Sequence, residues 1–169
     1  TNIDVLANDS DPDSDSLTIA TTSASQGSAT IVSGQIQYQP NTDFNGTDTI
    51  VYTLDDGQGG QVTSQVNVVI VAVNDAPIAN ADTANVDEDD LVTIDVLAND
   101  TDVDDTSLTL TSATVDTGIV SINAFNQLQY EPATNFFGTA SITYQISDAS
   151  GASASANVVV TVNSINDAP

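Results

Sequence analysis

The chain has 169 residues, and its 24 acidic residues are accompanied by no lysine, arginine, histidine or cysteine, so its formal net charge is −24. These absences exclude zinc cages, Ser-His and Cys-His nucleophile pairs, and the usual iron–sulfur and haem ligands. A surface this negative repels phosphate backbones, and the longest apolar run, residues 68–73, is too short to cross a bilayer, so we expect no nucleic-acid binding and no membrane insertion.

Two copies of one sequence unit follow each other along the chain. The segment Ile-Asp-Val-Leu-Ala-Asn-Asp occurs at residues 3–9 and again at 94–100, and Asn-Asp-Ala-Pro occurs at 74–77 and 166–169. One residue inserted between positions 118 and 130 explains the change of offset from 91 to 92. We therefore predict two domains, residues 1–77 and residues 78–169.

The first copy has no counterpart of residues 78–91, because Thr1 aligns with Val92. In a sandwich this segment is the first strand, and its absence leaves an unpaired sheet edge and an open flank of the core. Two interpretations follow. Either truncation or proteolysis set this boundary, or a neighbouring chain supplies the strand.

Apolar residues alternate with other residues along several segments, as expected for half-buried strands. The expected strands lie around residues 50–54 and 66–70 in the first copy and at 94–97, 108–114, 118–122, 127–130, 142–146 and 158–162 in the second. Gly, Asn, Asp and Pro separate them, and no segment has a helical period. This pattern predicts an all-β fold of two tandem antiparallel Greek-key β-sandwiches, the first of which lacks its N-terminal strand.

Most aromatic residues occupy matched positions in the two copies. The matched residues are Tyr38, Phe44, Tyr52, Tyr130, Phe136 and Tyr144. Aromatic side chains can form platforms for sugars, but matched residues on alternating strands favour a role in the core.

The acidic residues gather in matched loops. The first loop contains Asp9, Asp11, Asp13 and Asp15, and its counterpart contains Asp100, Asp102, Asp104 and Asp105. Alternating hard oxygen ligands suit Ca²⁺, which takes six to eight oxygens at about 2.3–2.6 Å. A solvated loop or a salt-adapted surface is the alternative, but such a surface would spread its acids over the strands. A glycosidase carboxylate pair needs a cleft and a raised pKa, so we expect no enzyme.

Together these motifs resemble the cadherin-like tandem repeats of bacterial calcium-dependent surface adhesins and RTX-type repeat proteins. The resemblance covers the whole chain. In order, it consists of Leu-Ala-Asn-Asp-x-Asp-x-Asp, Tyr-x-Pro, Phe-x-Gly-Thr, an Asp before the last strand, and a valine-rich strand that leads to Asn-Asp-Ala-Pro. It implies an Ig-like β-sandwich, Ca²⁺ as the cofactor and a location outside the cell.

Carried over position by position, the resemblance also implies calcium ligands at each linker. For the middle linker they are Asn74, Asp75, Asp102, Asp104 and Asp148. The N-terminal set is Asp11, Asp13 and Asp56, the C-terminal set is Glu88, Asn166 and Asp167, and the first acids of the two clusters, Asp9 and Asp100, complete the predicted metal ligands. Ala72 and Ser164 stand where the pattern usually has an acid, so we expect fewer ions than at a vertebrate cadherin junction.

Three functions from different classes agree with these features. The first is a calcium-rigidified structural extender in an extracellular bacterial adhesin or surface filament. The second is a carbohydrate- or ligand-binding adhesion module. The third is a self-assembling filament subunit that is completed by a donated β-strand. The expected partners are neighbouring repeats of the same chain or identical subunits, and no motif specifies the final adhesion ligand.

Overall fold

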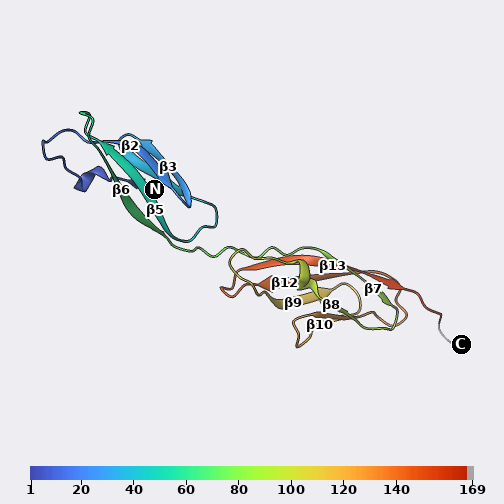
Figure 1. Ribbon diagram of the computed structural model, residues 1–169. Coiled ribbons are helices and arrows are strands. Elements are labelled where there is room, and N and C mark those ends of the chain that lie inside the picture. The colour runs from blue at the N-terminus through green and yellow to red at the C-terminus, as the bar shows by residue number, and fades with distance from the viewer. Residues whose placement is uncertain (167–169) are drawn as a thin grey trace. The chain divides into compact units, whose positions relative to one another are not determined.

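The computed structural model of the chain describes residues 1–166. It divides into two compact units, Thr1–Val73 and a second that begins at Asn74 (Figure 1). The sequence predicted a boundary after Pro77, whereas the second unit begins at Asn74 and therefore includes the Asn-Asp-Ala-Pro segment. Within the described part of the chain, no helix is long and apolar enough to cross a membrane.

The first repeat is a sandwich of two antiparallel sheets, β1-β4-β3 and β2-β5-β6. Its elements are β1 (Asn2–Ile3), the 3-10 turn η1 (Leu6–Asn8), β2 (Thr18–Ala24), β3 (Gly27–Val32), β4 (Gln35–Pro40), β5 (Gly46–Asp55) and β6 (Gln61–Ile70). Both sheets contribute to one core, whose buried members are Val5, Ile19, Ile36, Tyr38, Ile50, Tyr52 and Leu54. The period-two pattern therefore gives the inward face of each strand.

The second repeat has the same plan with one strand more. Its elements are β7 (Asp82–Asp87), β8 (Val92–Ile94), the 3-10 turn η2 (Val96–Asn99), β9 (Thr109–Val115), β10 (Ile119–Ile122), β11 (Leu128–Glu131), β12 (Gly138–Ser147) and β13 (Ser153–Asn163). The sheets are β10-β11-β8 and β7-β13-β12-β9. The prediction of two all-β sandwiches is confirmed, and the described residues of the first repeat include no counterpart of β7.

Two details differ from the sequence-based prediction. The strand expected at residues 94–97 ends at Ile94, and the following turn η2 buries Val96 completely. The backbone N–H of Asp100 donates to the Leu97 carbonyl, which closes this turn. The sandwich is also not wholly antiparallel, because β7 runs parallel to β13. An alternating pattern defines the inward face of a strand but not the direction in which it pairs.

The four tyrosines lie in the cores of their repeats, as predicted. Each of Tyr38, Tyr52, Tyr130 and Tyr144 is at most 5% exposed. The matched phenylalanines Phe44 and Phe136 are half-buried. Because the matched tyrosines fill the core, they do not provide the exposed platform that the carbohydrate-binding interpretation requires.

Candidate functional site

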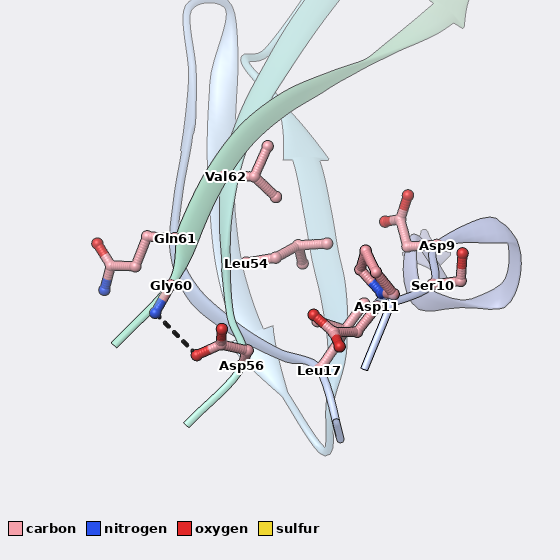
Figure 2. A pocket seen from close by; sticks show the side chains of 10 residues that line it. Asp9, Ser10, Asp11, Leu17, Leu54, Asp56, Gly60, Gln61 and Val62 are labelled. Atoms are coloured by element: carbon pink, nitrogen blue, oxygen red, sulfur yellow. Dashed lines mark hydrogen bonds between the residues drawn. The ribbon is translucent and has the colours of Figure 1, made fainter. Parts of the chain in front are cut away.

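Acidic side chains line a pocket of about 290 Å³ in the first repeat. The loop after η1 contributes Asp9 and Asp11, and the turn between β5 and β6 contributes Asp56. Figure 2 shows Asp9 and Asp11 on one side of the pocket and Asp56 on the other, with Leu54 between them. Asp13, which was predicted with this set, is not among the lining residues.

Hydrogen bonds to backbone N–H groups fix the two loops that carry these acids. Asp11 Oδ1 accepts from the N–H groups of Asp13 at 2.7 Å and Asp15 at 3.2 Å. Asp56 Oδ1 accepts from the N–H groups of Gln58 at 2.7 Å and Gly60 at 2.9 Å. Among the described residues, the second oxygen of each carboxylate accepts no hydrogen bond, so it remains available to solvent or to a cation.

The first acid of each cluster contacts a core tyrosine. The Tyr52 hydroxyl lies 3.4 Å from Asp9 Oδ2, and the Tyr144 hydroxyl lies 3.3 Å from the oxygens of Asp100. In the second repeat, Asp82 Oδ2 also lies 3.2 Å from the Tyr144 hydroxyl. Burial, followed by the charges of Asp100 and Asp82, raises the pKa of Tyr144 far above its usual range. Burial likewise raises the pKa of Asp82. Comparison of the two copies did not single out Asp82, because the first copy has no counterpart of β7.

The structure brings four of the five residues predicted for the middle linker together in two pairs. Asn74 Nδ2 donates to Asp148 Oδ2 at 2.7 Å, and the backbone N–H of Asp75 donates to Asp104 Oδ2 at 2.7 Å. The Asn74 amide and backbone N–H groups near residue 152 lower the pKa of Asp148, although its burial opposes them. The start of the second unit is therefore bonded to two acidic loops of its own repeat.

Asp102, the fifth residue of this set, organises the acidic loop. Its Oδ1 accepts from the N–H groups of Asp104 at 2.7 Å and Asp105 at 2.8 Å. Its Oδ2 is buried and has no hydrogen-bond partner among the described residues. Asp105 belongs to the acidic cluster found in the sequence but not to the predicted metal ligands. Its Oδ2 accepts from the Ala149 N–H at 2.9 Å and joins the loop to the turn before β13.

Glu88 lies at the other end of β13, directly after β7. It is 3% exposed, and its Oε1 accepts from the Ile165 N–H at 2.8 Å. The Glu88 N–H donates to the Asn163 carbonyl at 2.9 Å. Glu88 therefore lies beside the segment that leads to Asn166, whereas Asp167 lies outside the described residues.

These donor sets agree with calcium in their chemistry but are not assembled around an ion. Carboxylate and amide oxygens are the hard ligands that Ca²⁺ takes, and the buried, unpaired Oδ2 of Asp102 is an oxygen that a cation would satisfy. Within residues 1–166, however, no group of three or more acidic side chains is arranged to hold a metal ion. Binding would therefore require several of these carboxylates to come together around one ion.

The most deeply buried acidic residue belongs to neither loop. Asp48, in β5, is 0% exposed and accepts hydrogen bonds from Ser25 Oγ at 2.6 Å, Gln26 N–H at 2.9 Å and the Tyr38 hydroxyl at 2.9 Å. Burial raises its pKa, but these hydrogen bonds outweigh burial and lower the pKa to about 2. Ala140 occupies the matching position in the second repeat, so comparison of the two copies gave no signal for Asp48.

Comparison with known proteins identifies the family. The model of the bacterial Ig domain family matches residues 1–69 and 74–161. No match was found among curated protein sequences. Solved structures of low sequence identity share the fold, and cadherin ectodomains are among them.

A human mucin-like protocadherin fragment, EC1-2, is 17% identical with a TM-score of 0.54, and the match covers 89% of this chain and 84% of that one. Protocadherin gamma B7, domains 1–4, is 17% identical with a TM-score of 0.55, and the match covers 88% of this chain and 42% of that one. Drosophila N-cadherin, EC1-4, is 15% identical with a TM-score of 0.54, and the match covers 89% of this chain and 42% of that one. At these identities the likeness concerns the fold alone.

Proposed function

The chain belongs to the bacterial Ig domain family, and we propose that it is a calcium-dependent structural repeat pair that extends an extracellular adhesin or surface filament of a bacterium. One observation carries this proposal. The first two residues of the second unit, Asn74 and Asp75, are hydrogen-bonded to Asp148 and Asp104, which lie in separate loops of that unit. Oxygen-rich side chains thus converge on the segment that connects the repeats.

Calcium would relieve a repulsion that the chain has no other means to relieve. Two carboxylates about 5 Å apart repel each other by about 3 kcal/mol at an effective dielectric constant near 20. The sequence contains no lysine, arginine or histidine that would neutralise them. Asp102, Asp104 and Asp148, together with Asn74 and Asp75, would hold the ion, which supplies positive charge and joins the connecting segment to the acidic loops.

Calcium is therefore expected to stabilise the second repeat against heat. A ligand that binds only the folded state, at a concentration about 100 times its Kd, raises the free energy of unfolding by about 2.7 kcal/mol. For a domain of this size, this corresponds to a rise in Tm of roughly 10–20 °C. The measurement is calorimetry in EDTA and in millimolar CaCl₂ at matched ionic strength. MgCl₂ is the control, because Mg²⁺ keeps more of its water. Equal melting temperatures in EDTA and calcium would remove the metal-site proposal.

Asp104→Ala tests one ligand of the middle linker. We expect a roughly tenfold weaker calcium affinity, because calcium affinity follows the number of charged ligands. Asp104 lies in an exposed loop, so the core of the second repeat should remain folded. The measurements are calcium titration and small-angle scattering, which should report greater freedom between the repeats in the mutant.

Asp43→Asn is the matched control for the lost charge. Asp43 is exposed in the first repeat and has φ 59°, a conformation that asparagine tolerates. Like Asp104→Ala, the substitution Asp43→Asn removes one carboxylate, but from a position outside the predicted ligand sets. If Asp104→Ala and Asp43→Asn have the same calcium affinity as the unmodified chain, Asp104 is not a ligand.

A further inference from the structure

Three Asn-x-Ser/Thr triplets in the chain match the acceptor motif for N-linked glycans. They begin at Asn8, Asn45 and Asn99. Such a triplet is modified in a folded protein only where it lies on an accessible loop and where its amide and hydroxyl are free to react. The structure therefore distinguishes the three triplets, which the motif alone does not.

The triplets at Asn8 and Asn99 belong to the acidic loops, where their groups are already engaged. Both asparagines end a 3-10 turn. The Asn99 amide is occupied, because its Nδ2 donates to a backbone carbonyl at 3.3 Å and to Asp82 Oδ1 at 3.1 Å. The Asn8 side chain is exposed, but the next residue, Asp9, is fixed by its own N–H, which closes the turn at 3.3 Å, and by the Tyr52 hydroxyl at 3.4 Å. Neither triplet is free to rearrange around its amide.

The triplet at Asn45 lies at the surface, where the loop between β4 and β5 enters β5. Asn45, Gly46 and Thr47 are all exposed. Among the described residues, neither the Asn45 amide nor the Thr47 hydroxyl has a hydrogen-bond partner. Gly46 stands between them with φ +118° and without a side chain, so the segment can turn in ways that other residues disfavour. This triplet therefore offers both reactive groups to an enzyme.

The second repeat shows that a large group at this position points away from the core. Phe137 occupies the place of Asn45, and its side chain is 63% exposed. The backbone follows the same course in both loops, because the glycines that come next have φ 118° (Gly46) and 132° (Gly138). A bulky substituent on Asn45 is therefore accommodated outside the sandwich.

We propose that Asn45 is the acceptor of an N-linked oligosaccharide, which an oligosaccharyltransferase transfers from a lipid pyrophosphate donor outside the cytoplasm. The Asn45 Nδ2 forms a bond to the anomeric carbon of the first sugar, and the bond from that carbon to the pyrophosphate oxygen breaks. The lipid pyrophosphate leaves with the electron pair and the amide loses one proton, so no oxidant or reductant is needed. The proposal rests on the extracellular location in the proposed function, but not on calcium.

A glycan on Asn45 leaves the acidic pocket of the first repeat open. Asn45 directly precedes β5, whereas Asp56, which lines the pocket, directly follows it. The ten residues of β5 separate these two ends by about 30 Å. Glycosylation and calcium binding can therefore be measured separately on the same chain.

A purified bacterial oligosaccharyltransferase and a polyprenyl-pyrophosphate oligosaccharide, added to the folded chain, test this proposal. We expect the intact mass to increase by one glycan. Cleavage before aspartate releases residues 43–47 as one peptide, because Asp43 and Asp48 delimit it, and this peptide should carry the added mass. Asn45→Gln and Thr47→Ala should abolish the modification, whereas Thr47→Ser, which keeps the hydroxyl, should retain it.

The variant Phe137→Asn tests whether the loop selects the acceptor. It places the triplet Asn-Gly-Thr at residues 137–139, so the chain should accept a second glycan. Phe137 is exposed, so the variant should fold. Asn8→Gln and Asn99→Gln should each leave the modification unchanged.

Three results would overturn the proposal: no glycan on Asn45 of the folded chain, glycans on Asn8 or Asn99 to the same extent as on Asn45, or no second glycan on the Phe137→Asn variant. The enzyme and the donor are supplied in this assay, so its result does not depend on calcium. Equal melting temperatures in EDTA and calcium would remove the metal-site proposal and leave the glycan acceptor in place.

Discussion

Replacing Asp48 with Ala is expected to lower the Tm of the first repeat by about 5–15 °C and to leave that of the second repeat unchanged. The substitution removes the acceptor of the Ser25 Oγ, Gln26 N–H and Tyr38 hydroxyl donors at a site closed to water. Buried donors without a partner cost more than the hydrogen bond itself contributes. Calorimetry measures both transitions, and hydrogen exchange assigns each to its repeat.

The effect of Asp48 should also depend on pH. Its folded pKa, about 2, lies below the ordinary value of 3.8, so the ionised form is bound more strongly by the folded state. The resulting stability is fully present above pH 4 and is lost as the pH falls from about 4 to 2. The difference in Tm between the unmodified chain and Asp48→Asn should therefore shrink over this range. A difference that stays constant from pH 6 to pH 2 would contradict the assignment.

The two matched tyrosines provide the control for this network. The Tyr38 hydroxyl donates to Asp48, whereas the buried hydroxyl of Tyr130 has no partner among the described residues, because Ala140 stands where Asp48 would be. Tyr38→Phe should lower the Tm of the first repeat by a few degrees, and Tyr130→Phe should leave the second repeat unchanged or slightly more stable. Equal losses in both repeats would show that ring packing, and not the hydroxyl, accounts for the effect.

Features that depend on local pattern were predictable from the sequence. Strand positions follow from alternation and turn residues, and the alignment of the two copies revealed the missing counterpart of β7. The bonds of Asn74 to Asp148 and of Asp75 to Asp104 join residues that the resemblance grouped at the middle linker, and their role as metal ligands stays a prediction. Asp48 and Asp82 were missed because their surroundings come from residues far away in sequence, and the matching position is an alanine or has no counterpart.

The pairing of β7 with β13 shows what comparison of the two copies can predict and what only the structure adds. Aligning the copies shows that residues 78–91 have no counterpart in the first copy, but it does not show at which edge of the sheet this segment lies. The structure adds that β7 is parallel to β13 and that its side chains at positions 84 and 86 complete the core.

The second large effect is expected from alanine at the glycines that pack against the core tyrosines. A Cβ on Gly118 would clash first with the Glu131 carbonyl oxygen and would lie 2.9 Å from Tyr130 Cε2, and a Cβ on the matching Gly27 would clash first with the Gln39 carbonyl oxygen and would lie 2.7 Å from Tyr38 Cε2. These distances are too short for ordinary contact, and neither the backbone of the paired strand nor the enclosed tyrosine can move away. Each copy therefore has glycine where the chain lies close to both the backbone of the paired strand and the tyrosine ring.

The two substitutions should differ in size because only Gly118 has a positive φ, +87°. We expect Gly118→Ala to cost the second repeat about 2–4 kcal/mol, from overpacking and backbone strain together, and Gly27→Ala to cost the first about 1–3 kcal/mol from overpacking alone. Gly34→Ala is the control for strain without a clash, because Gly34 has φ +78° and no atom lies within 4 Å of its added Cβ, and it should cost about 1 kcal/mol. Urea unfolding followed by hydrogen exchange in each repeat measures all three. If Gly27→Ala is no more destabilising than Gly34→Ala, close packing against the Gln39 carbonyl and the Tyr38 ring does not explain the glycine.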